Sequence, residues 1–433
     1  MIDRYTRKEM AALWSEDSRL RSWLDVELAV CEVLTLEGIV PEEDMAVIRE
    51  KADFDIDRIA EIEATVGHDV IAFCTSVAEK VGPASRHIHY GLTSSDVVDT
   101  AQALRIVRAT DRLLAGIEAM LTVLRKQALA HRQTVMVGRT HGIHAEPYTL
   151  GLKFASWYAE AQRNRQRLTA VREEIAVGKI SGSVGTYAHL GPQVEAAVME
   201  RLGLKAETVS TQVVARDRLA NYMGVLGVLA SSLDRIATEI RHLQRSDVRE
   251  VEEPFRAGQK GSSSMPHKRN PIRCENVSGL ARVVRSNVQA ALENVALWHE
   301  RDISHSSVER VIVPDSTTLC DFMLSRMTSV LDGLHVYPER MQQNMQITRG
   351  LVFSQAVLLA LTESGMARDD AFAIVQRNAM RTWAGEGSFR ELLAADDAVL
   401  QALPDGRFEA CFEPEKFLQH VDTIYERTFG GKQ

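Results

Sequence analysis

The sequence has few features of an exported or membrane protein. No apolar run approaches the roughly 18 residues that a membrane helix needs, and the amino terminus, MIDRYTRKEM, has no apolar core of the signal-peptide kind. Five cysteines stand singly without a CxxC pair, so neither a disulfide framework nor a zinc cage is expected. We therefore expect a cytoplasmic protein with reduced thiols. The cysteines are Cys31, Cys74, Cys274, Cys320 and Cys411.

Positive charge is also scarce. The 433 residues carry a formal net charge of -8. This balance argues against a nucleic-acid partner, because phosphate neutralisation favours a surplus of Lys and Arg on one face. Any anion site must therefore be a local basic pocket. A chain of this length has room for roughly two or three domains whose cores need no disulfide or metal.

Proline, which interrupts helices, occurs only eleven times. The long intervals between prolines show helical rather than alternating patterns. A shorter helix is expected from about Asp17 to Glu37, ending at Gly38 before Pro41. We expect shorter helices in an N-terminal domain (1–93) and a C-terminal domain (341–433), around a central long-helix bundle domain (94–340). The proline-free intervals run from Pro83 to Pro147, Pro192 to Pro254, Pro271 to Pro314 and Pro338 to Pro404.

Two of these intervals contain apolar seams at helical spacing. Residues 223–230, MGVLGVLA, are apolar on every face, and such a helix has to be buried on all sides. We infer that long helices from several subunits pack together; a large single-chain core is the alternative. The first seam comprises Val107, Leu114, Ile117, Leu121, Leu124 and Ala128, and the second comprises Leu226, Leu229, Leu233, Ile236, Ile240 and Leu243.

The segment from Arg256 to Arg273, RAGQKGSSSMPHKRNPIR, is basic within an acidic protein. It contains five Lys or Arg residues and no carboxylate. Three serines offer hydroxyls, and Pro271 suits the first turn of a helix that begins near Ile272. Helix-start amides would add to the positive field, so the segment predicts an anion site. A flexible charged linker is the alternative, and no Walker loop is present.

A second motif is RTHGIH at 139–144, which precedes Pro147 at the end of a long helical interval. An unperturbed imidazole titrates near pH 6.5, so His141 could act as an acid or base at neutral pH. His87, His89 and His68 also stand beside polar residues. A packed or solvated histidine is the alternative for each. Metal ligation is not expected, because no HExxH or completing carboxylate spacing occurs.

The third motif is GLTSSD at 91–96, ahead of a long helix. Ser95 or Asp96 is expected to cap this helix. A cap alone leaves the other hydroxyls, Thr93 and Ser94, without a role. Several hydroxyls next to helix-start amides are what a carboxylate cradle needs.

GSSSMPHKRNP at 261–271 resembles the GSSxMPxKxNP signature of the fumarase and aspartase superfamily. LTSSDVVDTA at 92–101, RTHGIHAEP at 139–147 and the opening IDRYT resemble its adenylosuccinate lyase family, and the likeness runs from end to end. The resemblance implies an all-α, three-domain subunit in a homotetramer, with a shared central helical bundle and active sites built from three subunits. It also implies cleavage of adenylosuccinate to AMP and of SAICAR to AICAR, each with release of fumarate. No cofactor and no metal are implied.

The resemblance further implies that Ser262 is the base, with Ser263 as the rival. The base removes a proton from the succinyl carbon next to a carboxylate. A serine can do so only where positive charge favours loss of its proton. Lys268 and the amides of the turn at 261–264 could supply that field and stabilise the dianionic intermediate.

The general acid implied by the resemblance is His141, which would protonate the departing nitrogen, with Glu275 orienting its ring. His68 and His89 match family site histidines and are assigned phosphate or substrate contacts. The succinyl group is expected to contact Thr93, Ser94, Lys268 and Asn270, with Gln212 nearby. The other expected substrate contacts are Arg4, Tyr5, Asp69, Ser263, Met265, Arg301, Ser306 and Arg310.

One position departs from the family pattern. Many adenylosuccinate lyases carry Arg before the His-Asp pair, whereas this chain has Gly67, so a substrate contact is missing or is supplied elsewhere. Two alternative functions remain at this stage. One is another lyase of the superfamily, such as argininosuccinate lyase or carboxymuconate cycloisomerase. The other is a non-catalytic structural homologue of the lens-crystallin kind.

Overall fold

The fold consists of two compact units, each assembled from three separate stretches of sequence. Because only compactness defines these units, the three-domain division at 93 and 340 stays a prediction. The computed structural model describes residues 1–255, 258–404 and 406–430, so Arg256 lies outside the described residues. The first unit is Met1–Ala119, Arg163–Arg235 and Asn276–Arg326, and the second is Met120–Gln162, Ile236–Glu275 and Met327–Gln433.

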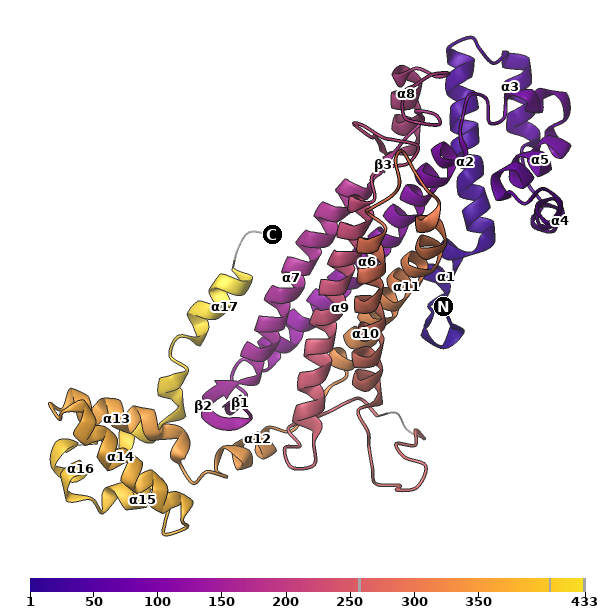
Figure 1. Cartoon of the computed structure of the whole chain (residues 1–433). Helices are drawn as coiled ribbons and strands as arrows, with labels where there is room; N and C mark the ends of the chain where they lie inside the picture. Colours follow the sequence, from indigo (N-terminus) through magenta and orange to yellow (C-terminus); the bar gives the residue numbers. More distant parts are fainter. Residues whose placement is uncertain (256–257, 405, 431–433) are drawn as a thin grey trace. The chain divides into compact units, whose positions relative to one another are not determined.

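Helices dominate both units, which confirms the expected helical class (Figure 1). Five long helices have parts in each unit: α6 (Ser94–Ala130), α7 (Leu150–Ile175), α9 (Asp217–Gln244), α10 (Ile272–Glu293) and α11 (Ser304–Asp332). Elements wholly in the first unit are η1 (Asp3–Tyr5), α1 (Lys8–Trp14), α2 (Glu16–Leu36), α3 (Glu42–Lys51), α4 (Ile56–Val66), α5 (Asp69–Val81), η2 (Gly82–His87), β3 (Val177–Gly178), α8 (Pro192–Leu202) and β4 (Lys205–Ala206).

The second unit adds shorter helices and two small sheets. In the described residues, strands pair only as β1 with β2, β3 with β4, and β5 with β6. None of the described helices is long and apolar enough to cross a membrane. The elements of the second unit are β1 (Val135–Thr140), β2 (Ile143–Thr149), β5 (Val251–Glu252), β6 (His335–Val336), α12 (Pro338–Met345), η3 (Leu351–Phe353), α13 (Ser354–Glu363), α14 (Arg368–Trp383), α15 (Phe389–Ala394), α16 (Asp397–Ala402), η4 (Glu409–Phe412), η5 (Pro414–Phe417) and α17 (Val421–Phe429).

Side-chain contacts bind the long helices together within the first unit. Thr110 of α6 donates to the buried hydroxyl of Tyr222 on α9 (2.9 Å). Asn164 of α7 donates to Ser232 of α9 (2.9 Å), so α9 is bonded to helices on two sides. Satisfied polar pairs of this kind fix the register of helices that apolar packing alone would leave free to slide.

Local sequence signals place α2 within one residue of its expected bounds. Ser15 caps the start by accepting a hydrogen bond from the Ser18 amide (3.1 Å). Gly38 follows the end with a φ of 74°, the left-handed conformation that favours glycine.

The α9 seam is confirmed, because all six of its predicted residues are buried. The α6 seam is shifted in its first half. Ile106 and Leu113 are buried there, whereas Val107 and Leu114 are only half-buried. A strict seven-residue step drifts around a helix with 3.6 residues per turn, and a one-residue shift corrects for this drift.

The expectation that residues 223–230 are buried on every side does not hold within one chain. Met223 and Leu226 are fully buried, but the side chain of Val228 is 45% exposed. The outward face of this stretch of α9 therefore remains apolar and uncovered.

Pro314 does not mark a helix boundary, because it lies inside α11. The helix continues although proline cannot donate to the preceding turn, at a cost of roughly 3 kcal/mol. Val313 and Leu319 are buried on either side of it, and Thr317 donates to the Val313 carbonyl (2.8 Å). Burial along the whole helix outweighs the local defect.

Candidate active site

The first unit contains a cavity of about 950 Å³, of the size that small-molecule sites have. Its wall brings together the starts of α5 and α6, the 212 loop and the segment around the start of α11. These segments are far apart in the sequence. The expected site residues in the wall are His68, Asp69, Thr93, Ser94, Gln212, Arg301, Ser306 and Arg310.

A buried carboxylate holds the hydroxyl-rich turn before α6. Asp96 Oδ2 accepts from the Thr93 amide (2.8 Å), and its Oδ1 accepts from the amides of Ser181 (3.1 Å) and Gly182 (3.2 Å). Lys179, fully buried like Asp96, forms an ion pair with it. The helix begins at Ser94, so Ser95 and Asp96 lie inside it, contrary to the expected caps. Asp96 instead bonds back to the residue before the helix, as in one half of a capping box.

Two cationic side chains expected to face the nucleotide are tethered within the wall. Arg310 forms an ion pair with Asp69. Burial raises the pKa of Asp69, but the hydrogen bond and charge of Arg310 lower it more, so the net shift is downward. Arg301 donates to Gln212 Oε1 (2.9 Å). An anion that enters the cavity meets guanidinium groups already held in place.

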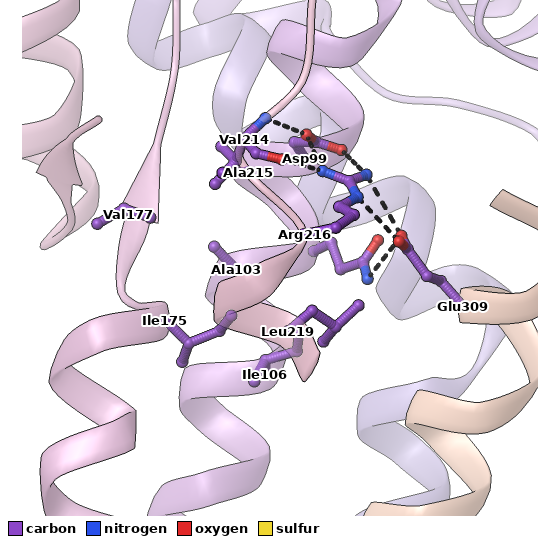
Figure 2. Close-up of a pocket in the computed structure, with 11 residues that line it drawn as sticks. Asp99, Ala103, Ile106, Ile175, Val177, Val214, Ala215, Arg216, Leu219 and Glu309 are labelled. Carbon is purple, nitrogen blue, oxygen red and sulfur yellow. Dashed lines mark hydrogen bonds and ion pairs between the residues drawn. The ribbon is translucent and has the colours of Figure 1, made fainter. Parts of the chain in front are cut away.

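A buried ionic network, drawn in the close-up of a neighbouring pocket that shares some of its residues (Figure 2), also contributes to the cavity wall. Arg216 donates to both oxygens of Asp99 (2.7 and 2.9 Å) and to Glu309 Oε1 (2.8 Å). Its Nη2 also lies 3.1 Å from His305 Nδ1, and the other ring nitrogen accepts from Arg301 Nε (3.3 Å). Burial raises the pKa of Asp99 while Arg216 lowers it more, so it stays ionised. The network thus reaches Arg301 through His305.

The structure adds two cations that sequence reasoning missed. Arg19 lies over the Trp23 ring (4.4 Å from Cζ to the centroid), and Arg105 lies over the Trp14 ring (4.6 Å). Both arginines line the cavity. Burial lowers the pKa of Arg105 to about 10, which still leaves it charged at neutral pH. Neither arginine has a local signal, because arginine is ordinary within a helix and only the fold brings them here.

Gly67, the departure from the family pattern, also lines the cavity. It ends α4 with a φ of 66°, and a Cβ there would meet no atom within 4 Å. Space would therefore admit a larger side chain, but the backbone conformation disfavours one. Arg19 and Arg105 supply cations to the same cavity.

The expected base lies in the second unit, within the basic segment. Ser262 Oγ accepts from the amides of Ser264 (3.3 Å) and Met265 (3.1 Å). Two amide donors on one hydroxyl oxygen favour its deprotonated form. Asn270 donates to the Gly261 carbonyl (3.1 Å) and closes the turn. Helix α10 begins at Ile272, as expected.

His141 occupies a hairpin that sequence reasoning missed. It forms the two-residue turn between β1 and β2 with Gly142, and their φ values are 56° and 80°. A two-residue turn with both φ values positive matches the twist of a hairpin, and glycine in its second position is the missed signal. Arg139 anchors the hairpin by donating to both oxygens of buried Glu250 (2.9 and 2.7 Å).

Several expected pairings do not occur within one chain. His141 and Glu275 are exposed, and no hydrogen bond or ion pair joins them in the described residues. Arg4 and Tyr5 lie in the first unit outside the cavity wall, where the Tyr5 ring packs edge-on against Phe322 (5.5 Å). Ser263, Met265 and Lys268 are exposed side chains of the basic segment, and their roles stay predictions.

The helical fold and these motifs define a lyase of the fumarase and aspartase class. A family model described as a lyase matches residues 3–286, and one for the adenylosuccinate lyase C-terminus matches residues 350–428. Adenylosuccinate lyases from Synechocystis and Bacillus subtilis are 55% and 50% identical, over 99% of this chain and of each relative. The chain belongs to the adenylosuccinate lyase family, and these relatives support that function for it, as a carbon–nitrogen lyase.

Solved structures of the same superfamily share the fold of this chain. A fumarate lyase from Mesorhizobium is 27% identical with a TM-score of 0.92, covering 100% of both chains. A 3-carboxy-cis,cis-muconate lactonizing enzyme from Pseudomonas putida is 30% identical with a TM-score of 0.90, covering 98% of this chain and 96% of that one.

Replacement of Arg216 by methionine should destabilise the protein strongly, because Asp99 and Glu309 would remain buried without a cation. A broken buried pair costs about 3–5 kcal/mol, whereas an exposed pair contributes about 0–1 kcal/mol. Arg310→Met, which breaks the more exposed pair with Asp69, is the matched control. Urea denaturation followed by circular dichroism measures both. Equal midpoints for the two variants would contradict the structural role of Arg216.

Proposed function

We propose that the chain eliminates fumarate from adenylosuccinate, giving AMP, and from SAICAR, giving AICAR, by acid–base anti elimination. The observation that carries this substrate proposal is the cavity of the first unit, where guanidinium groups and hydroxyls from distant segments meet. A succinylated nucleotide carries a phosphate and two carboxylates. Anions of these kinds suit Arg and helix-start hydroxyls.

In the proposed reaction, Ser262 takes a proton from the succinyl carbon next to a carboxylate. The electron pair first resides on that carboxylate, giving a dianion, and then forms the carbon–carbon double bond as the C–N bond breaks. His141 gives its proton to the departing nitrogen. The amides that bond Ser262 Oγ support its assignment as base, since they favour an oxyanion there.

We further propose that the active unit is a homotetramer whose sites combine residues of three subunits. His141, Lys268 and Glu275 are exposed in the single chain, although proton transfer benefits from a site closed to water. The uncovered apolar face of α9 around Val228 supports contact with other copies.

Incubation of the purified protein with adenylosuccinate should release AMP and fumarate in equal amounts, and SAICAR should yield AICAR and fumarate. Chromatography of the products measures both. Argininosuccinate and carboxymuconate, offered in parallel, should not turn over, because relatives with adenylosuccinate lyase activity are the more similar ones. Turnover of either in place of adenylosuccinate would overturn the substrate assignment, and inactivity with all four would favour the structural-homologue alternative.

Ser262→Ala and His141→Ala should each lower kcat by about 10²- to 10⁴-fold, because each removes a proton-transfer group. Ser263→Ala is the matched control, since it removes a hydroxyl from the neighbouring position without touching the amide-bonded oxygen. Steady-state kinetics with adenylosuccinate measures all three. A larger loss in Ser263→Ala than in Ser262→Ala would assign the base to Ser263.

Mixing inactive Ser262→Ala and His141→Ala proteins should restore part of the activity, because hybrid tetramers with shared sites regain some intact ones. Subunit exchange is confirmed separately with differently tagged chains. If exchange occurs and activity stays absent, the two groups belong to the same subunit at each site, and the shared-site proposal is wrong.

A further inference from the structure

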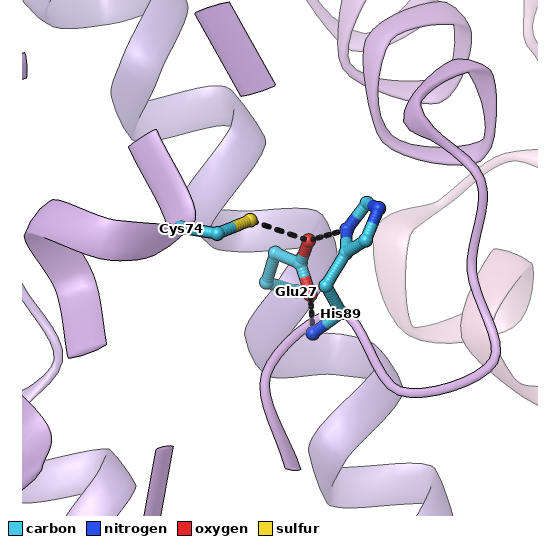
Figure 3. Close-up of side chains that lie close together, drawn as sticks. All are labelled: Glu27, Cys74 and His89. Atoms are coloured by element: carbon cyan, nitrogen blue, oxygen red, sulfur yellow. Dashed lines mark hydrogen bonds and ion pairs between the residues drawn. The ribbon is translucent and has the colours of Figure 1, made fainter. Parts of the chain in front are cut away.

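Glu27 is a fully buried carboxylate on α2 with no role in the reaction described above. Both of its oxygens accept hydrogen bonds from His89: Oε1 lies 2.7 Å from ring Nδ1, and Oε2 lies 2.8 Å from the backbone nitrogen (Figure 3). A buried carboxylate is costly unless it is paired and hydrogen-bonded. The two hydrogen bonds from His89 therefore stabilise the buried charge of Glu27.

The backbone at His89 is strained. Its φ is 60°, a left-handed conformation that is uncommon for residues other than glycine and costs about 1–3 kcal/mol. The bond from the His89 amide to Glu27 offsets this strain. Glu27 thus fixes the main chain and the ring of His89 together.

The hydrogen bond to Glu27 also determines which ring nitrogen is available. Nδ1 faces the carboxylate, so it carries a proton, and Nε2 makes no hydrogen bond within the described residues. His89 and Ser94 line a cavity of about 280 Å³, and Ser94 also lines the larger cavity. His89 therefore lines a cavity together with Ser94, one of the hydroxyl residues expected to bind substrate.

Charges around His89 favour its cationic form. Burial lowers the pKa of His89, but the hydrogen bond and charge of Glu27 and the charge of Asp96 raise it more, so the net shift is upward. Glu27 faces the ring from α2, Asp96 acts from α6, and Cys74 is the nearby titratable group on α5.

Glu27, Cys74 and His89 also have the composition of a metal site. Both oxygens of Glu27 are already bonded to His89, however. Burial and the charge of Glu27 raise the pKa of the Cys74 thiol, so it stays protonated. A neutral thiol beside an occupied carboxylate fits an ion-paired histidine better than a metal ligand set.

We propose that Glu27 is a positioning residue that holds His89 as an oriented cation, with its Nε2–H available to an oxyanion of the substrate. This inference rests on the proposed function, because it takes the succinylated nucleotide as the ligand. The oxyanion is either the phosphate or a succinyl carboxylate. The two products separate these cases, since AMP carries only the phosphate and fumarate only the carboxylates.

Glu27→Gln keeps the shape of the side chain and removes its charge. It should raise KM for adenylosuccinate about tenfold with a smaller effect on kcat, because a charge-assisted hydrogen bond becomes a neutral one. The wild-type imidazolium is present below its raised pKa and is lost as pH rises through it. In the variant the pKa of His89 falls, so the rise in KM with pH should begin at lower pH.

Glu195→Gln is the matched control, because it makes the same change at another buried carboxylate that lines neither cavity. It should leave the dependence of KM on pH unchanged.

A double-mutant cycle tests whether Glu27 acts through His89. In a His89→Gln background, Glu27→Gln should cause no further increase in KM. An equal increase in KM in both backgrounds would overturn the proposal. If the wild-type protein does not turn over adenylosuccinate at all, the proposed function is refuted instead.

If Glu27→Gln fails to fold, Glu27→Asp retains the charge and should give an intermediate KM. Weaker inhibition of Glu27→Gln by AMP alone assigns the oxyanion to the phosphate, and weaker inhibition by fumarate alone assigns it to the carboxylates; unchanged inhibition by both would contradict the proposal.

Discussion

Buried carboxylates, each held by several donors, are the interaction on which the candidate site depends. Asp96 binds the turn that carries Thr93 and Ser94, and Glu27 binds the backbone and ring of His89. In the second unit, Glu250 holds the hairpin of His141 through Arg139. The same device appears at the end of the basic segment. There, Glu253 accepts from the amides of Arg273 (3.1 Å) and Cys274 (2.6 Å).

This arrangement explains how flexible residue types can form a precise site. Glycine and serine in loops cost conformational entropy when they are ordered, and a loop on the surface has few apolar contacts to offset that cost. A carboxylate taken out of water gains most of its stabilisation from charge-assisted hydrogen bonds, which are short and directional. Each buried acid therefore requires its loop to adopt one conformation. The cost of ordering the loops is met within the scaffold, before any ligand binds.

Capping residues and helical periodicity in the sequence predicted helix bounds and buried helix faces, because these features depend mainly on neighbouring residues. The bounds of α2 follow from Ser15 and Gly38, and the α9 seam follows from the helical period. The motifs and the family resemblance also identified eight of the polar residues that meet in the large cavity. The hairpin around His141 was missed because most of it lies between Pro83 and Pro147, an interval whose pattern was interpreted as helical.

Long-range pairing could not be predicted from one sequence. Asp99 and Arg216 are separated by 117 positions and meet only after α6 and α9 pack together. The same holds for Glu27 and His89, where an acid inside an ordinary helix gives no sign of its partner. Pro314 does not end its helix for a related reason, since burial along the whole of α11 outweighs one missing hydrogen bond. In each case the deciding energy comes from tertiary contacts.

The exposure of the proposed catalytic side chains to solvent limits what a single chain could catalyse. In the single chain, Arg301 and Arg310 of the large cavity are held by neighbouring side chains, whereas Lys268 and His141 face solvent. A cation in water does little to lower the pKa of a serine, because solvent screens its field; the same charge in a closed site acts far more strongly. The proposed proton abstraction by Ser262 would therefore require that these exposed groups become covered. An apolar helix face that one chain leaves open, as around Val228, is the kind of surface through which further copies would provide that cover.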